Sequence, residues 1–363
     1  MKVIISGGGS GGHIFPAVAI ADKIKERIPG AEILFVGASG KMEMEKVPKA
    51  GYSIKGLPIR GLQRKLTLKN LSFPFRLIAS LIKAARIIKD FKPDIAIGVG
   101  GYASGAVLRV AAFKGIKTLV QEQNGYPGLT NKLLANKVDK ICVAYSGMDK
   151  YFPKEKIVLT GNPVRNGMEN LTDSKEEARK HFGLSPEKKT VLLFGGSLGA
   201  RSLNEAMGDN TEILDSRSDV QWLWQCGKLY IEKFKNTETA NLRHVHITKF
   251  IDRMDLAYKA ADLAVTRAGA LSISELSLVG QAAILIPSPN VAEDHQTKNA
   301  KALVESDAAV LIEDKYATDK MVQASYDLLD NTQKLDTLSV NVKKLAQPRA
   351  ADVIVDEIIK LCE

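Results

Sequence analysis

The chain has 363 residues, of which 45% are apolar and 25% charged, an ordinary composition for a globular protein and enough chain for two domains. Its three cysteines, Cys142, Cys226 and Cys362, lie far apart and form no CxxC pair, which argues against a disulfide framework or a zinc site and favours a reducing compartment. No run of 18 apolar residues occurs, and the apolar stretch after Met1 is short. We therefore expect neither a membrane-spanning segment nor a secretory leader.

The net charge of +10 is divided unevenly along the chain. Residues 1–162 contain 26 basic and 11 acidic residues, a net charge of +15, whereas the remainder contains 25 and 30, a net charge of −5. A basic half indicates a polyanionic partner, either nucleic acid or an anionic membrane surface, although a solvated protein surface would account for the charge as well. Because no known basic nucleic-acid-binding motif occurs, we expect no nucleic-acid partner.

Short β-rich runs alternate with longer helical patterns from end to end. In chain order, strands are expected at residues 3–5, 33–36, 95–99, 118–120 and 140–143, and then at 190–194, 220–224, 245–247, 263–266, 283–286 and 309–312. Apolar stripes predict helices at 16–28 and about 350–362. The alternation predicts parallel sheets covered by helices, and its restart after residues 161–163 predicts two Rossmann-like α/β domains with a cleft between them.

Three glycine-rich loops follow expected strands, at residues 7–13, 98–105 and 195–201. Glycine allows close approach of a ligand, and the N-terminus of a following helix presents free N–H groups, so such loops are typical of anion sites. The first loop matches G-x-G-x-x-G, but strand 33–36 ends without the carboxylate that NAD binding needs. The loop at 195–201 lacks the Lys-Ser/Thr pair of an ATPase P-loop. Tight turns alone would explain one loop, whereas equivalent loops in both halves favour a shared ligand at the strand ends.

Taken together, these motifs resemble the MurG family of bacterial glycosyltransferases over nearly the full chain. The segments that carry the resemblance are residues 8–16, 100–105, 121–125, 161–165, 195–201, 267–275 and 294–300. Two positions depart from the family pattern. Position 121 is Gln where some relatives have His, which bears on acceptor contacts, and position 268 is Ala where some have Ser.

The resemblance implies a GT-B fold, with two Rossmann-like domains and a deep cleft. Residues 1–162, completed by a C-terminal helix at about 347–363, would bind the acceptor and associate with the membrane, and residues 163–346 would bind UDP-GlcNAc. The implied reaction is inverting: GlcNAc passes from UDP-GlcNAc to the MurNAc 4-hydroxyl of undecaprenyl-pyrophosphoryl-MurNAc-pentapeptide (lipid I), which gives lipid II for peptidoglycan. The implied location is peripheral, at the cytoplasmic face of the bacterial inner membrane.

The resemblance also implies site residues. Those expected to contact UDP-GlcNAc are Ser10, Gly11, Gly12, Asn124, Arg165, Ser197, Ile251, Ala270, Leu271, Ser272, Glu275 and Gln296, and those expected to contact the acceptor are Gly101, Tyr102 and Ser104. Glu275 would accept both ribose hydroxyls, Ile251 would contact uracil through its backbone, and Gln296 would bind the sugar hydroxyls. Without the resemblance, Glu275 would be interpreted as a carboxylate favoured by a helix N-terminus.

His13, at the end of the first glycine loop, is the candidate for acid–base catalysis. A histidine there can take the proton of a sugar hydroxyl or donate a hydrogen bond to the acceptor diphosphate, and both roles stay open. No Asp-x-Asp occurs in the chain, so we expect no metal site and no cofactor, with loop N–H groups and helix dipoles stabilising the leaving UDP. A loosely bound ion, which needs no dedicated ligands, stays open.

Residues 59–92 interleave basic and apolar side chains. Nine basic residues stand against the single acid Asp90. The basic residues are Arg60, Arg64, Lys65, Lys69, Arg76, Lys83, Arg86, Lys89 and Lys92, and between them lie Leu62, Leu66, Leu71, Phe73, Phe75, Leu77, Ile78, Leu81 and Ile82. Such a pattern suits an anionic bilayer surface, and it equally suits an apolar core face with a solvated basic face.

Two other enzyme functions fit the same architecture. One is a GT-B transferase with another lipid acceptor, which would keep the donor loops but not the motifs at 100–105 and 121–125. The other is a UDP-GlcNAc 2-epimerase, which would convert the donor without any acceptor.

Overall fold

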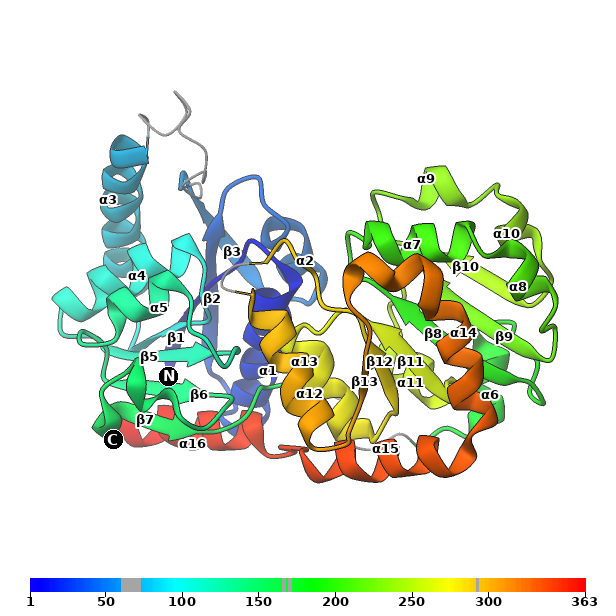
Figure 1. Cartoon of the computed structure of the whole chain (residues 1–363). Coiled ribbons are helices and arrows are strands. Elements are labelled where there is room, and N and C mark those ends of the chain that lie inside the picture. Colours follow the sequence, from blue (N-terminus) through cyan, green and yellow to red (C-terminus); the bar gives the residue numbers. More distant parts are fainter. Residues whose placement is uncertain (60–72, 165–167, 169–171, 292–293) are drawn as a thin grey trace. The chain divides into compact units, whose positions relative to one another are not determined.

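The computed structural model describes residues 1–59, 73–164, 168, 172–291 and 294–363. The chain divides into two compact units. Unit 1 is Met1–Asn166 together with Arg349–Glu363, and unit 2 is Gly167–Pro348 (Figure 1). Each unit is built on one parallel sheet with helices on both faces, so the predicted fold class of two Rossmann-like domains is confirmed.

The sheet of unit 1 has the strand order β3-β2-β1-β4-β5-β6-β7, and every pair is parallel. The strands are β1 (Lys2–Ser6), β2 (Glu32–Ala38), β3 (Ser53–Leu57), β4 (Ile95–Gly98), β5 (Lys117–Glu122), β6 (Lys140–Val143) and β7 (Ile157–Leu159). Strands β3 and β7, at the two edges of the sheet, were not predicted from the sequence. In β3 the apolar residues are interrupted by Lys55 and Gly56, and β7 is an apolar run of only three residues, none of them fully buried.

The inner strands of unit 1 bury alternate side chains on opposite faces of the sheet. Val3 and Ile5 pack in one apolar cluster with α1 and α16, and Ile4 packs in another with α3 and α4. The helices of this unit are α1 (Gly11–Arg27), α2 (Glu43–Lys49), α3 (Phe73–Phe91), α4 (Tyr102–Phe113), α5 (Leu129–Leu134) and α16 (Ala350–Cys362). Among the described residues, no helix has the length and apolar character needed to cross a bilayer.

Helix α1 corrects one sequence prediction, because it begins at Gly11 rather than at residue 16. The expected bounds came from the apolar stripe at 16–28, which does not extend into the glycines before it. In the structure Pro16 lies inside α1, where it supplies no N–H to the helix ladder. As a result, Gly11, Gly12 and His13 are helical residues, and the first glycine loop ends at Ser10, the N-cap residue.

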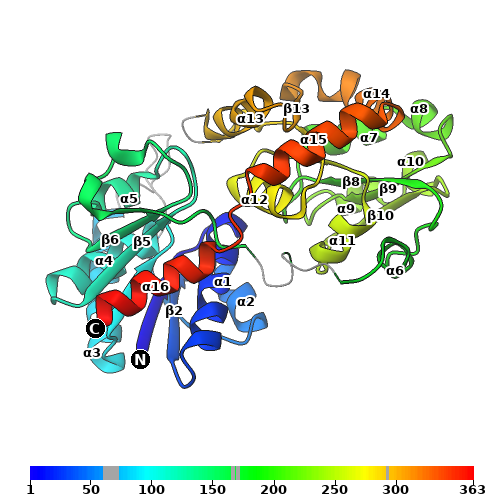
Figure 2. The ribbon, with the colours of Figure 1, turned by 90° about the horizontal axis from the view of Figure 1, so that it is seen from below.

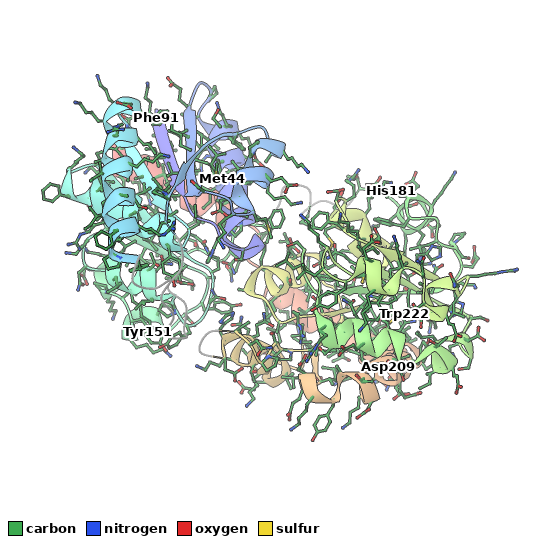
Figure 3. All side chains as sticks on the ribbon, turned by 90° about the horizontal axis from the view of Figure 1, so that it is seen from above. Met44, Phe91, Tyr151, His181, Asp209 and Trp222 are labelled. Atoms are coloured by element: carbon green, nitrogen blue, oxygen red, sulfur yellow. The ribbon has the colours of Figure 1, made fainter. Side chains whose placement is uncertain are left out.

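The sheet of unit 2 has the order β10-β9-β8-β11-β12-β13, again wholly parallel. Its strands are β8 (Lys189–Phe194), β9 (Val220–Gln225), β10 (Val245–Thr248), β11 (Leu263–Thr266), β12 (Ala283–Leu285) and β13 (Val310–Leu311). Its helices are α6 (Lys175–His181), α7 (Arg201–Gly208), α8 (Thr211–Asp215), α9 (Ile231–Phe234), α10 (Glu238–Asn241), α11 (Met254–Ala260), α12 (Ala270–Val279), α13 (His295–Glu305), α14 (Ala317–Asp330) and α15 (Thr332–Lys344). All strands predicted for this half are present. Trp222 of β9, labelled in Figure 3, is fully buried in the apolar core of unit 2.

The C-terminal helix α16 belongs to unit 1 although it follows the last helix of unit 2. It lies along α1, as Figure 2 shows, and buries Ile354, Val355 and Ile358 against that face of the sheet. Arg27 of α1 forms an ion pair with Asp356 at 2.6 Å. The apolar burial is the main contribution, because an exposed ion pair stabilises a fold by about 1 kcal/mol at most.

We expect Ile358→Ala to destabilise unit 1 by about 2–5 kcal/mol, because the substitution leaves a cavity in a fully buried site. Hydrogen exchange read by mass spectrometry separates the two units. Exchange should accelerate in peptides from β1 and α1 and stay unchanged in peptides from β8 and β9. Val340→Ala on α15, where the side chain is 57% exposed, is the control and should leave both sets unchanged. Equal acceleration of hydrogen exchange in both units would contradict the assignment of α16 to unit 1.

Candidate functional site

The carboxyl ends of β1 and β4 form the centre of the candidate site in unit 1. These strands are neighbours at the point where the strand order reverses, which is where ligands bind in open parallel sheets. The loops that follow them touch through their backbones. A Cβ added at Gly101 would lie 2.8 Å from the Gly8 carbonyl oxygen, and one added at Gly7 would lie 2.1 Å from the Val99 side chain. Only glycine fits at these two positions.

His13 lies in the first turn of α1, and its ring is fixed by the first loop. Nδ1 lies 2.8 Å from the Gly8 carbonyl oxygen. Because a carbonyl only accepts hydrogen bonds, Nδ1 carries the proton in this contact, and Nε2 of the neutral ring has the free lone pair. Gly100 leaves room beside Nε2, since a Cβ there would lie 2.8 Å from it. A ring held in this way can accept a proton at Nε2.

The other predicted site residues of unit 1 differ in their exposure to solvent. Ser10 and Gly12 are exposed and Gly11 is half-buried, so the start of α1 is open to a ligand. Tyr102, the first residue of α4, is also exposed. Ser104 is fully buried, with its Oγ beneath Gly98, so it has no exposed atom through which to contact an acceptor directly.

The loop after β5 is held by the buried carboxylate of Glu122. Its Oε1 accepts hydrogen bonds from the backbone N–H of Asn124 at 3.0 Å and from the Asn124 side chain at 3.2 Å. Its Oε2 accepts from the Gly128 N–H at 3.0 Å and the Asn131 side chain at 2.8 Å. Four donors on one carboxylate fix the loop, and they place the Asn124 amide at its half-buried tip.

Gln121, the departure noted in the sequence, takes part in a buried amide network. Its side chain donates to Asn162 Oδ1 at 3.0 Å, and Asn162 in turn donates to the Gln123 carbonyl at 3.0 Å. The Gln123 amide donates to the Val99 carbonyl at 3.0 Å. Because Gln121 is fully buried in this network, its effect on an acceptor would be exerted through the loop rather than by contact.

In unit 2 the equivalent loop follows β8, at the reversal of strand order there. Its backbone packs against the turn after β9, because a Cβ at Gly199 would lie 2.2 Å from the Cys226 carbonyl oxygen. Ser197 is half-buried in this loop. Burial raises the pKa of the Cys226 thiol to about 12, so this thiol stays protonated beneath the loop at neutral pH.

Gln225, at the end of β9, joins two parts of this region that the sequence predicted separately. Its amide donates to the Gly196 carbonyl at 3.1 Å and accepts from the Ile251 N–H at 2.8 Å. Gln225 is buried, and sequence reasoning did not single it out. One side chain therefore sets the position of the glycine loop relative to the backbone at Ile251.

Helix α12 begins at Ala270, after the short segment that follows β11, and β11 neighbours β8 in the sheet. Leu271 and Ser272 are half-buried in its first turn. Glu275 lies one turn later than the helix start at which it was expected. It is buried, and its Oε2 accepts a hydrogen bond from the Tyr258 hydroxyl at 3.1 Å.

Arg267, the residue that follows β11, connects several loops of this region. Its guanidinium donates to the Ile286 carbonyl at 3.0 Å and to Ser202 Oγ at 2.9 Å, and it forms an ion pair with Asp314. The sequence contained Arg267 in a motif without assigning it this role. Gln296, in the first turn of α13, accepts from the Ser288 N–H at 2.8 Å. Arg165 lies outside the described residues.

Comparison with known proteins places this geometry in a family. Residues 3–143 match the glycosyltransferase family 28 N-terminal domain, and residues 190–354 match the glycosyltransferase family 28 C-terminal domain. A relative from Flavobacterium psychrophilum, named UDP-N-acetylglucosamine–N-acetylmuramyl-(pentapeptide) pyrophosphoryl-undecaprenol N-acetylglucosamine transferase, is 54% identical over 100% of this chain and 98% of its own length.

Solved structures agree with this similarity. The crystal structure of Acinetobacter baumannii MurG has a TM-score of 0.74 and 29% identity, and the match covers 99% of both chains. The UDP-GlcNAc 2-epimerase from Neisseria meningitidis, solved with UDP-GlcNAc bound, has a TM-score of 0.70 at 13% identity over 99% of this chain and 100% of its own, a likeness of fold alone. By full-length identity and by both domain matches, the chain belongs to glycosyltransferase family 28 and, within it, to the MurG family.

Proposed function

We propose that the chain transfers GlcNAc from UDP-GlcNAc to the MurNAc 4-hydroxyl of undecaprenyl-pyrophosphoryl-MurNAc-pentapeptide, and so converts lipid I into lipid II for peptidoglycan synthesis. The observation that carries this proposal is the 54% identity, over the full chain, to a relative named for that transfer. The two glycine loops at the strand-order reversals support it, because each leaves room for a ligand where the central strands end.

For the donor, we propose that unit 2 binds UDP-GlcNAc along the ends of β8, β9 and β11. The N–H groups of the 195–199 loop and Ser197 would hold the diphosphate, and the start of α12, Ala270 to Ser272, would add its free N–H groups. Ile251, positioned by Gln225, would contact uracil, and Glu275 would accept the ribose hydroxyls. Gln296 and Asn124 would bind the sugar, and Arg165 would add positive charge.

For the acceptor, we propose that unit 1 binds lipid I near Gly101 and Tyr102. Ser10, Gly11 and Gly12, at the open start of α1, would contact UDP-GlcNAc. The 4-hydroxyl attacks the anomeric carbon of the α-linked donor, its proton passes to Nε2 of His13, and UDP leaves with the electron pair of the broken bond. A single displacement of this kind gives a β-1,4 product. The fixed Nδ1 contact of His13 supports its role as the base.

Radiolabelled UDP-GlcNAc with a short-chain lipid I analogue should give a labelled disaccharide lipid and free UDP. Donor alone should give neither product nor UDP-ManNAc. Because removal of a general base typically costs 10²–10⁴-fold in rate, His13→Ala should lower kcat within that range. Conversion of the donor without acceptor would instead identify an epimerase, and transfer only to a different lipid would overturn the proposed acceptor.

Glu275→Gln should weaken UDP binding about 10–100-fold, because a hydrogen bond to a charged group contributes about 1.5–3 kcal/mol and the amide lacks the charge. Isothermal titration with UDP measures the affinity without any turnover. Glu305→Gln, at an exposed position at the end of α13, is the matched control and should bind UDP as the unaltered chain does. An unchanged affinity in Glu275→Gln would remove this residue from the donor site.

We also propose that helix α3 attaches the enzyme to the cytoplasmic face of an anionic bilayer. The core side of α3 is formed by residues such as Ala84, Ile87 and Ile88. On the opposite side Phe75, Ile78 and Ile82 are 76%, 56% and 58% exposed although they are apolar.

With successive residues 100° apart around the helix, the exposed Arg86 and Lys89 continue the stripe formed by these apolar side chains. An exposed apolar stripe extended by basic residues is what an anionic membrane surface binds. Arg60, Arg64, Lys65 and Lys69 of the sequence prediction lie outside the described residues.

Reversing the charge of two basic residues, in Arg86→Glu with Lys89→Glu, should weaken co-sedimentation with phosphatidylglycerol vesicles by at least tenfold. Each basic residue near an anionic surface contributes about 1 kcal/mol. Binding by the unaltered chain should also fall as salt rises. The pair Lys180→Glu and Lys301→Glu, exposed in unit 2, changes the net charge equally and is the control. Equal loss in both pairs, or binding insensitive to salt, would contradict a site on α3.

A further inference from the structure

Glu43, the first residue of α2, carries a carboxylate that is buried against the first glycine loop. Its side chain is 1% exposed, and no described lysine, arginine or histidine forms an ion pair with it. Oε2 accepts a hydrogen bond from the Gly9 N–H at 2.9 Å, and Oε1 accepts one from the Ala38 N–H at 2.9 Å. Burying a charge is costly, so a carboxylate held by two backbone N–H groups calls for a reason beyond packing.

The Gly8–Gly9 peptide connects this carboxylate to His13. The N–H of that peptide belongs to Gly9 and donates to Glu43, and its carbonyl belongs to Gly8 and accepts from Nδ1 of His13 at 2.8 Å. One planar peptide group thus has the carboxylate at its donor end and the imidazole at its acceptor end. The chain of contacts runs from carboxylate to peptide to ring.

We propose that Glu43 is a positioning residue for His13: it fixes the orientation of the Gly8–Gly9 peptide and thereby holds the His13 ring with its proton on Nδ1 and its lone pair on Nε2. The orientation of the ring stands on the geometry of unit 1 alone. Its consequence for turnover rests on the proposed function, in which His13 accepts the proton of the acceptor hydroxyl.

A peptide between two glycines needs such a restraint. Gly8 and Gly9 have φ values of +149° and +88°, and glycine meets little steric resistance to rotation of the peptide between them. If that peptide turned over, the Gly8 carbonyl oxygen would face the carboxylate, and the two negative groups would repel. The charge of Glu43 therefore selects the orientation in which the carbonyl points to His13.

The packing of Glu43 adds a steric restraint. A Cβ at Gly8 would lie 2.2 Å from its Cδ, and a Cβ at Gly37 would lie 2.5 Å from its Cγ. The side chain thus fills space that only glycine leaves at the ends of β1 and β2. Helix α2, whose Met44 is labelled in Figure 3, supplies the support from which the carboxylate reaches the loop.

The contact also affects the His13 ring electronically. A carboxylate at the N–H of a peptide polarises it and makes its carbonyl a stronger acceptor. The stronger acceptor keeps the ring proton on Nδ1 and raises the electron density at Nε2. A carboxylate that binds a histidine directly acts in the same way; here one peptide group stands between the two.

The tautomer of His13 tests the proposal without any turnover. In long-range ¹⁵N–¹H spectra of histidine-labelled chain, with His13→Ala to assign the signals, the wild-type ring should be protonated on Nδ1. Glu43→Gln keeps the size of the side chain but removes the charge, and it should shift the ring toward the Nε2-protonated form. The control is Glu45→Gln on the same helix, where the carboxylate is exposed and pairs with Lys49, and it should leave the spectrum unchanged. A wild-type ring protonated on Nε2, or no shift in Glu43→Gln, would overturn the proposal.

Transfer kinetics test the consequence. We expect Glu43→Gln to lower kcat about 10–100-fold, the usual effect of removing a residue that orients a functional histidine, with the KM for UDP-GlcNAc unchanged. Because the effect passes through His13, Glu43→Gln should lower kcat no further in a chain that already carries His13→Ala. If Glu43→Gln lowered kcat in the His13→Ala chain by the same factor as in the wild-type chain, the proposal would be overturned. Absence of transfer by the wild-type chain would instead refute the proposed function, and the tautomer result would stand apart from it.

Discussion

Direct contact between backbones at the carboxyl ends of the central strands is the constraint on which both candidate sites depend. In unit 1 the loops after β1 and β4 touch at Gly8 and Gly101, and in unit 2 the loop after β8 touches the turn after β9 at Gly199. A side chain at any of these points would collide with a neighbouring backbone or residue. Because glycine has no side chain, the backbone of each loop is uncovered at these points, and a ligand can be held by the backbone itself.

The two loops differ in how their hydrogen-bonding groups are used. In unit 1 the Gly9 N–H is already bound to the carboxylate of Glu43, which places a negative charge beneath the loop. In unit 2 the corresponding support, Gln225, is neutral and binds the loop through the Gly196 carbonyl, so it consumes no loop N–H. An anion is therefore favoured more by the second loop than by the first. This difference agrees with a diphosphate in unit 2 and with proton transfer from a hydroxyl in unit 1.

Much of this protein was predictable from its sequence, and what was missed has physical reasons. The buried inner strands, such as β1 and β8, are continuous apolar runs that periodicity detects, and the family followed from motif order. The edge strand β3 gives no such run because Lys55 and Gly56 interrupt it, and the three apolar residues of β7 form too short a run to stand out. Glu43 stands in a run of alternating charged residues that resembles an exposed helix start, and only the fold brings it beneath Gly8, 35 residues earlier in the chain. Gln225 is likewise a polar residue ending an apolar strand, and its two contacts depend on loops distant in sequence.

The uneven charge of the chain acts over a different range from the site contacts. At physiological ionic strength, charge is screened within about 8 Å, so the excess of basic residues in 1–162 acts mainly on a surface that comes close to it. A bilayer that meets the α3 stripe satisfies this condition. UDP-GlcNAc is also anionic, yet its proposed site lies in the half with a net charge of −5. The proposed donor site therefore depends on groups within hydrogen-bond distance, above all the N–H groups of the loop and of the start of α12. Under the two proposals, net charge would act on the membrane surface, and short-range contacts would act on the donor.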